Sequence, residues 1–309
     1  MSHASRGAAL AALALVAASC GSGDGAEPTT TDSPTSSRPE TTTTHLPAAT
    51  TTSSAGSTTS SVGTIGRVVY LLLDEVGGGT GGPFLVPVYR EAPAAGDPAT
   101  LAVEMLLRGP TADEIAGIPA LHTAIPEGTA VLGLTIDSGV ATVDLSSEFD
   151  DGGGSASMFA RLAQVAYTVT RAAQVDEVAF YLEGEPVTVF SSEGIELDRP
   201  QTRSDYYDWL PAIFVESPAW GEPVTSPIQV EGLSNVFEAV SQVMLTDDDG
   251  LALFEETVTA TCGNGCWGEW EVVIPYTVDR DQVGALLVWE NSAQDGSRIN
   301  IREYPVWLR

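Results

Sequence analysis

Cys262 and Cys266 are the residues whose type and spacing could most readily do chemistry. They enclose Gly-Asn-Gly, and Trp267 follows directly. A structural zinc site needs four ligands, and the surrounding sequence offers no further cysteine or histidine. A redox pair usually opens a helix that lowers the thiol pKa, and the glycines disfavour a helix here. We therefore expect a disulfide, with Gly-Asn-Gly as a short hairpin loop between paired strands.

Cys20 ends a segment that is typical of protein export. Arg6 precedes an unbroken apolar run at 8–18, and small residues lead into the cysteine. This is the order of a signal peptide, and the run is shorter than the ~20 residues of a membrane span. The stretch VAASC resembles the lipobox of bacterial lipoproteins, although alanine stands where leucine is more usual. That resemblance implies lipidation of Cys20, whereas the alternative is a plain secretory signal.

The sequence after the expected signal peptide (1–20) divides into a stalk and a folded part. Residues 21–64 are rich in Ser, Thr and Pro and almost free of large apolar residues. Such a composition cannot offset the entropy of ordering, so we expect a disordered stalk, whose hydroxyls could carry O-linked sugars. The remaining residues, about 245, suit two domains of ordinary size. Export also places the cysteines in an oxidising compartment.

Net charge excludes one class of partner. The chain carries a formal charge of −29, and all 13 basic residues are arginine. The first 64 residues account for −2 of this charge, so −27 falls on the folded part. So acidic a surface repels the phosphates of nucleic acids and anionic lipid headgroups. We expect no nucleic-acid binding.

Groups suited to catalysis are few. After the stalk the only histidine is His122, there is no lysine, and no hydrolase, zinc-protease or P-loop motif occurs. An enzyme would need a pocket with perturbed carboxylates, for which His122, Asp144 and Glu148 are the candidates. We expect no catalytic residue, no cofactor and no metal site. The run Asp247-Asp248-Asp249-Gly250 lacks EF-hand spacing and predicts a hairpin turn.

The pattern over 65–203 predicts an α+β domain, with helices packed on a sheet. A glycine-rich stretch separates two β-branched segments, and Asp97-Pro98 marks a helix start that ends near Arg108. Two strands joined at Ser138-Gly139 form a predicted hairpin. The second predicted helix and the strands that follow it cover 155–173, 175–184 and 186–190. Apolar residues at helical spacing predict one buried stripe on that helix; they are Met158, Phe159, Leu162, Val165, Ala166 and Val169.

Three motifs in this domain carry a family resemblance. They are LLRGPT at 106–111, IPEGT at 125–129 and VDLSSEF at 143–149. With the segments around them they resemble the GerMN domain, which is named for sporulation and spore-germination proteins and occurs in bacterial envelope lipoproteins. The resemblance implies a non-enzymatic envelope module whose fold is similar to ring-building modules of secretion-like complexes.

Residues 211–309 predict an all-β domain. Apolar segments recur about every 12 residues, and turn signals such as Asp249-Gly250 and Asp295-Gly296 separate several of them. This spacing favours an antiparallel sandwich. The series LTDDDG, GEWEVVIPY, LLVWENSAQDGS and YPVWL resembles the Gmad2 domain, an immunoglobulin-like module that commonly follows GerMN. Bulky aromatics in the connector RSDYYDWLP (203–211) indicate a packed junction.

Two functional hypotheses follow. The first is a lipid-anchored, extracytoplasmic scaffold on the outer face of the cell membrane, which binds other envelope proteins through sheet edges and arginine–carboxylate contacts. The alternative is a lipoprotein that binds peptidoglycan or another cell-wall glycan. Three or more coplanar exposed rings along one groove would favour that function, and the candidates are Trp209, Trp220, Trp267 and Trp289.

Overall fold

The computed structural model describes residues 63–74 and 81–309, all of which belong to one compact unit, Thr59–Arg309. The expected signal peptide, Cys20 and nearly all of the expected stalk lie outside the described residues. No helix in the described part of the chain has the length and apolar character needed to cross a membrane.

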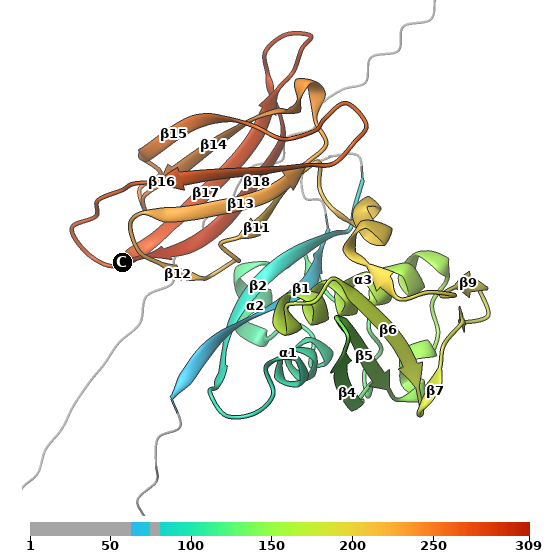
Figure 1. The fold of residues 1–309 in the computed structure, drawn as a ribbon. Coiled ribbons are helices and arrows are strands. Elements are labelled where there is room, and N and C mark those ends of the chain that lie inside the picture. Colours follow the sequence, from blue (N-terminus) through green and yellow to red (C-terminus); the bar gives the residue numbers. More distant parts are fainter. Residues whose placement is uncertain (1–62, 75–80) are drawn as a thin grey trace, which may run out of the picture. The chain divides into compact units, whose positions relative to one another are not determined.

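The first domain has two main sheets rather than one, besides a small two-stranded sheet (Figure 1). In the first sheet, β1 (Thr64–Leu73) lies between β2 (Phe84–Pro93) and β3 (Leu121–His122), and both pairings are antiparallel. The second sheet has the order β10-β6-β5-β4, with β7 beside β6. Its strands are β4 (Val131–Asp137), β5 (Val140–Leu145), β6 (Glu177–Leu182), β7 (Glu185–Pro186) and β10 (Gln201–Thr202).

Helices join these two sheets. α3 (Ser155–Ala173) contacts β1 of the first sheet and β5 and β6 of the second, so a single apolar helix serves both. The predicted α+β class is confirmed, but the expectation of one sheet is wrong, because α3 occupies the position between the two. Phe159 is also an exception to the predicted stripe: it is exposed, while the other members are buried.

Local sequence signals explain the helix ends. α1 (Pro98–Leu107) begins where Asp97 Oδ1 accepts a hydrogen bond from Thr100 N at 2.8 Å. The sequence analysis missed α2 (Ala112–Gly117), although Thr111 and Glu114 form a capping box at its start. No residue of this short helix is buried, so it lacks the apolar periodicity on which the prediction relied. A small two-stranded sheet, β8 (Val189–Phe190) with β9 (Ile195–Glu196), precedes the connector.

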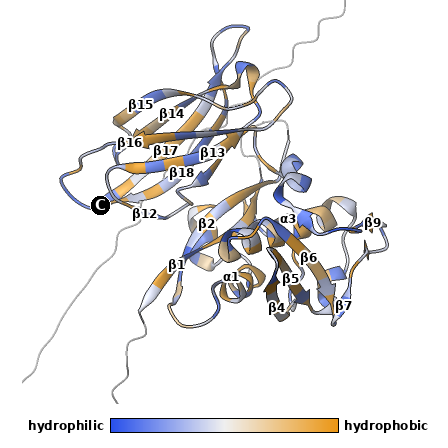
Figure 2. Ribbon diagram, in the orientation of Figure 1, coloured by the Kyte–Doolittle hydropathy of each residue, from blue (hydrophilic) through white to orange (hydrophobic). Residues whose placement is uncertain are grey.

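The second domain is a sandwich of two sheets, as predicted. One sheet has the order β11-β13-β16 and the other β12-β18-β17-β14-β15. Buried and exposed residues alternate along β13 and β16, so each strand turns one face to the core. Figure 2 shows apolar residues along these strands and along α3. The strands are β11 (Ile213–Ser217), β12 (Pro223–Val224), β13 (Ile228–Ser234), β14 (Val240–Thr246), β15 (Ala252–Thr259), β16 (Gly268–Ile274), β17 (Gln282–Asn291) and β18 (Arg298–Leu308).

The described residues also include three short 3-10 segments: Ser147–Asp150, which leads from β5 to α3, Arg203–Trp209 (η2) and Phe237–Ala239. The segment Asp247–Gly250 forms the β14–β15 turn, in which Asp247 Oδ1 accepts from the backbone N–H groups of Asp249 and Leu251. That side chain is therefore occupied within the turn. The prediction of a hairpin turn at this segment is confirmed.

The cysteine segment departs from the expected hairpin. β15 pairs with β14 in one sheet and β16 pairs with β13 in the other, so the chain from β15 to β16 crosses between the two sheets. Cys262 and Cys266 are joined by a disulfide within this crossing, with Cα atoms 5.8 Å apart. Thr261 N donates to Glu269 O at 2.9 Å beside it. The bridge therefore closes a loop between sheets instead of facing strands of one ladder.

Candidate functional site at the domain junction

A buried ion cluster joins the two domains around one carboxylate. Glu216, near the end of β11, accepts hydrogen bonds at Oε1 from Arg171 Nη1 and Arg203 Nη1, each at 2.8 Å. The hydroxyl of Tyr70 donates to the same oxygen. Only 17% of the Glu216 side chain is exposed. The three donors come from β1, the last turn of α3 and the start of η2, so four elements meet at this atom.

Aromatic rings hold the Arg203 guanidinium in place. Its carbon lies 4.8 Å from the Tyr167 ring centroid and 5.5 Å from that of Tyr70. Tyr167 also makes an edge-to-face contact with Phe214 of β11, at 6.2 Å between centroids. Arg203 Nε donates to Thr170 Oγ1 at 2.7 Å. The guanidinium is thus fixed by both helix and strand residues.

The electrostatics of the cluster favour an ionised carboxylate. Burial by itself would raise the pKa of Glu216, but the charges of Arg203 and Arg171 and the Tyr70 hydrogen bond outweigh it and hold the pKa below its ordinary value. Burial, followed by the negative charge of Glu216, raises the pKa of Tyr70. A carboxylate with a lowered pKa and three donors on one oxygen is poorly suited to general-base chemistry. The cluster therefore acts as a fixed link between domains.

Trp220 makes the second junction contact. Its backbone N–H donates to Pro87 O at 2.8 Å, and its carbonyl accepts from Tyr89 N at 2.9 Å, so it pairs with the outer edge of β2. The indole Nε1 donates to Glu303 O of β18 at 3.0 Å. The next residue, Gly221, donates its N–H to Pro305 O at 2.8 Å. One short segment is hydrogen-bonded to a sheet of each domain.

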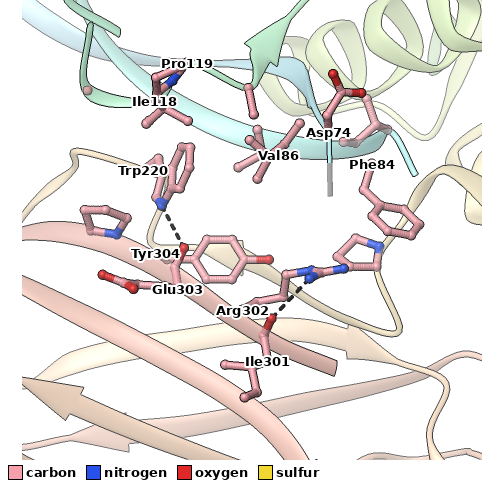
Figure 3. A pocket seen from close by; sticks show the side chains of 16 residues that line it. Asp74, Phe84, Val86, Ile118, Pro119, Trp220, Ile301, Arg302, Glu303 and Tyr304 are labelled. Carbon is pink, nitrogen blue, oxygen red and sulfur yellow. Dashed lines mark hydrogen bonds between the residues drawn. The ribbon is translucent and has the colours of Figure 1, made fainter. Parts of the chain in front are cut away.

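A groove of about 770 Å³ lies beside Trp220 (Figure 3). Val86 and Trp220 face Tyr304 across it, and Phe84 lies toward its other side. Burial raises the pKa of Tyr304 to about 12, so its hydroxyl stays neutral. Most lining side chains are apolar; they are Leu73, Phe84, Leu85, Val86, Ile118, Pro119, Ala120, Pro211, Trp220, Ile301, Tyr304 and Pro305, with Asp74, Gly117, Arg302 and Glu303.

Comparison with protein families assigns both domains. The Germane family, described as sporulation and spore germination, matches residues 68–188. Gmad2, described as an immunoglobulin-like domain of bacterial spore germination, matches residues 212–297. The chain carries a GerMN domain followed by a Gmad2 domain. The Glu216 cluster therefore joins these two modules, since Tyr70 and Arg171 lie in the GerMN match and Glu216 in the Gmad2 match.

Solved structures similar to this chain include bacterial relatives. The first GerMN domain of the Bacillus subtilis sporulation protein GerM is 20% identical, with a TM-score of 0.38 over 46% of this chain and 99% of that one. The tandem GerMN domains of GerM are 16% identical, with a TM-score of 0.40 over 70% and 63%. A Clostridium perfringens putative lipoprotein is 18% identical, with a TM-score of 0.31 over 47% and 91%. No curated protein matches the chain in sequence.

The three candidate catalytic residues of the GerMN domain have separate partners. His122 Nδ1 lies 3.7 Å from Asp74 Oδ2 in the first sheet. Asp144 Oδ1, in the second sheet, accepts from Gly184 N at 3.0 Å. A hydrogen bond from Ser146 lowers the pKa of the half-buried Glu148. Within residues 63–74 and 81–309, no group of three or more His, Cys, Asp or Glu side chains is arranged to hold a metal.

The tryptophans do not form the row of exposed rings that would favour the glycan hypothesis. Trp220 and Trp289 are buried, and Trp209 and Trp267 are half-buried. Trp307, which the sequence analysis did not single out, is 40% exposed. Arg298 lies 4.0 Å over the Trp289 ring. The four tryptophans named for the glycan hypothesis therefore do not supply three exposed rings.

Sequence reasoning missed all four members of the cluster, Tyr70, Arg171, Arg203 and Glu216. A weak signal was present, because Tyr70 interrupts the apolar run VVYLLL and Arg171 ends the buried face of α3. The aromatic connector pointed to a packed junction, and the structure has one: Tyr206 and Leu210 are buried. The pattern could not supply the pairing of Glu216 with Tyr70, which lies 146 positions earlier in the chain.

Proposed function

We propose that this protein is a lipid-anchored, extracytoplasmic scaffold of the bacterial cell envelope that binds other envelope proteins and performs no catalysis. The observation that carries the proposal is the junction: a GerMN and a Gmad2 domain are held as one body by Glu216 and Trp220. A scaffold needs fixed spacing between its binding surfaces, and a buried charge cluster supplies it. The families' association with sporulation and germination supports an envelope setting.

Anchoring rests on Cys20, whose thiol would carry the lipid on the outer face of the cell membrane. Several acyl chains suffice for stable attachment. The test is to express the full chain and its Cys20→Ser variant in a bacterial host with a clickable fatty acid, and then to fractionate the cells. Label and membrane association in the parent chain, both lost in the variant, are expected. An unlabelled, freely secreted parent chain would overturn the anchor.

Partner binding is tested separately. Photocrosslinking residues placed on exposed positions of both domains in intact cells should give discrete adducts with envelope proteins.

Co-sedimentation with protein-stripped cell-wall sacculi at two salt concentrations examines the glycan alternative. We expect no salt-resistant pelleting, since only Trp307 is substantially exposed among the tryptophans. Salt-resistant binding would favour the glycan-binding lipoprotein instead.

A further inference from the structure

The outer edge of β2 is open where it lines the groove. In antiparallel pairs, hydrogen-bonded and non-hydrogen-bonded positions alternate. Tyr70 and Pro87 form a non-hydrogen-bonded pair, because Tyr70 N donates to Thr168 and Tyr70 O accepts from Gln164. Leu85, two residues before Pro87, is therefore also in a non-hydrogen-bonded pair. Its backbone N–H and C=O point away from β1, on the side where Trp220 pairs with β2.

Leu85 is only 1% exposed, yet these two backbone groups have no protein partner within the described ranges. Buried backbone groups are almost always paired, by protein or by water.

The same alternation holds on β18. Pro305 lacks an N–H, and its carbonyl accepts a hydrogen bond from Gly221 instead of from β17. Glu303, two residues earlier, therefore also points its backbone groups away from β17. Glu303 O accepts from the Trp220 indole, and Glu303 N has no partner among described residues.

The chain itself shows that one strand fits between these edges. Trp220 pairs with β2 in parallel, and β12, three residues later, pairs with β18 in parallel. At this point a single extended segment occupies the gap between the two sheets. Leu85 of β2 and Ile301 of β18 both line the groove, which continues the gap along the two edges. Figure 3 shows Val86 and Ile301 on these two sides.

The walls and rim indicate the chemistry of the occupant. Apolar side chains such as Val86, Ile118 and Ile301 line the groove, which suits alternate apolar residues of an extended peptide. Asp74 and Glu303 are exposed at its rim. Arg302 is the cation among the lining residues. Its guanidinium carbon lies 5.2 Å from the Phe84 ring centroid, in a cation–π contact. The rim is thus complementary to a basic peptide.

We propose that this groove binds an extended segment of a partner protein, which adds as a strand to the outer edge of β2 and carries alternating apolar side chains and at least one basic residue. Strand addition of this kind draws its affinity from main-chain hydrogen bonds and its specificity from side-chain pockets. The groove would be one binding site of the proposed scaffold. This proposal rests on the proposed function, which makes another envelope protein the source of the peptide.

The test uses the full chain carrying Cys20→Ser and a phage library of random decapeptides as the probe. Enrichment of alternating apolar sequences with Arg or Lys is expected. The best peptide is then synthesised with its natural backbone and with N-methyl groups at alternate residues of one edge. Its affinity for the protein should fall at least ten-fold with N-methylation, because the donors of one strand edge are lost.

Two matched variants locate the site. Ile301 and Ile136 are each 48% exposed, but only Ile301 lines the groove. Ile301→Asp should weaken peptide binding at least ten-fold, while Ile136→Asp on β4 leaves it within two-fold; circular dichroism and thermal melting confirm that both fold.

Several results would overturn the inference. They are the absence of enriched peptides, equal binding to the Ile301→Asp variant, indifference to N-methylation, or a dimer that Ile301→Asp dissociates, which would make a second copy the occupant. None of them affects the Cys20 labelling experiment. Loss of peptide binding with intact lipidation and envelope adducts therefore rejects the groove alone, whereas loss of lipidation rejects the anchor alone.

Discussion

Tyr70 and Glu216 are 146 residues apart in the chain, yet the tyrosine hydroxyl donates a hydrogen bond to the glutamate carboxylate. One residue belongs to the GerMN domain and the other to the Gmad2 domain. Two arginines complete the shell of the same oxygen. Because neither domain alone can pair these charges, we expect the contact to couple the unfolding of the two domains.

Replacing Glu216 tests that link. Glu216→Gln should cost about 3 kcal/mol of unfolding free energy, because it leaves the guanidinium groups of Arg171 and Arg203 without a counter-charge in a mostly buried site. By calorimetry we expect the parent chain to melt in one transition and the variant in two. Glu255→Gln, at an exposed position on β15, is the control and should change stability by less than about 0.5 kcal/mol. A variant that melts like the parent would refute the link.

Acid should weaken the same contact. The pKa of Glu216 is held below its ordinary value in the folded protein. Its contribution to stability is therefore fully present above the unfolded-state pKa, about 4.3, and is lost as the pH falls through the lowered folded value. Melting curves of the parent chain and Glu216→Gln between pH 7 and pH 3 should converge on acidification. A constant difference in melting temperature would contradict the assigned ionisation.

Trp220 should be the most costly tryptophan to truncate at the junction. Its ring is 9% exposed, its indole is bonded to Glu303 O and its backbone to β2. Trp220→Ala is expected to lose about 3–5 kcal/mol, from the emptied volume and the lost hydrogen bond. Trp307→Ala, at an exposed site, should lose less than about 1 kcal/mol. Chemical denaturation of both variants gives the comparison, and similar losses would count against the junction role.

Gly232 should not tolerate a side chain. A Cβ there would lie 2.2 Å from Phe214 O and 2.5 Å from the Trp270 ring. Because one neighbour is backbone, Gly232→Ala is expected to cost about 3 kcal/mol or more. The matched control is Gly117→Ala, where nothing lies within 4 Å, and it should change stability by less than about 1 kcal/mol. Equilibrium unfolding in urea measures both, and a stable Gly232→Ala variant would show that β11 and β16 can separate there.

The disulfide should matter little for global stability. Cys262 and Cys266 are four positions apart, and so short a loop gives about 2 kcal/mol at most in the chain-entropy model. Cys262→Ser should therefore lower the melting temperature modestly and leave the chain folded. Circular dichroism at room temperature checks this, and an unfolded variant would show that the bridge holds the two sheets together.

Much of the fold was accessible from sequence because its signals are local. Asp97 and Pro98 marked the start of α1, and Ser138-Gly139 marked the turn between β4 and β5, where both residues have positive φ. The division of the GerMN strands into two sheets was not accessible, since the apolar residues of β1 and β5 indicate strands without indicating which strands they pair with. The prediction of a hairpin at the cysteines was wrong for a similar reason. The sequence near Thr259 and Gly268 does not indicate that their strands pair in different sheets.

The candidate site was less predictable than the fold. Glu216 lies in FVES, a sequence typical of the end of a strand, and Arg203 lies in a polar connector. Their meeting depends on how α3, η2 and β11 pack, which is long-range information. The open edge at Leu85 is likewise invisible in sequence, because it depends on the register between β1 and β2 and on where Trp220 ends its pairing.

The register between β1 and β2 has a mechanical consequence. Thr64 opposes Pro93 and Leu73 opposes Phe84, so ten consecutive residue pairs run along the strand by which the chain enters the GerMN domain. A load applied through Thr64 and resisted at the Gmad2 domain, to which β2 is bonded through Trp220, acts along these strands rather than across them. The hydrogen bonds are then strained together in shear and do not open one after another. We therefore expect the pairing of β1 with β2 to resist a pulling force applied at Thr64.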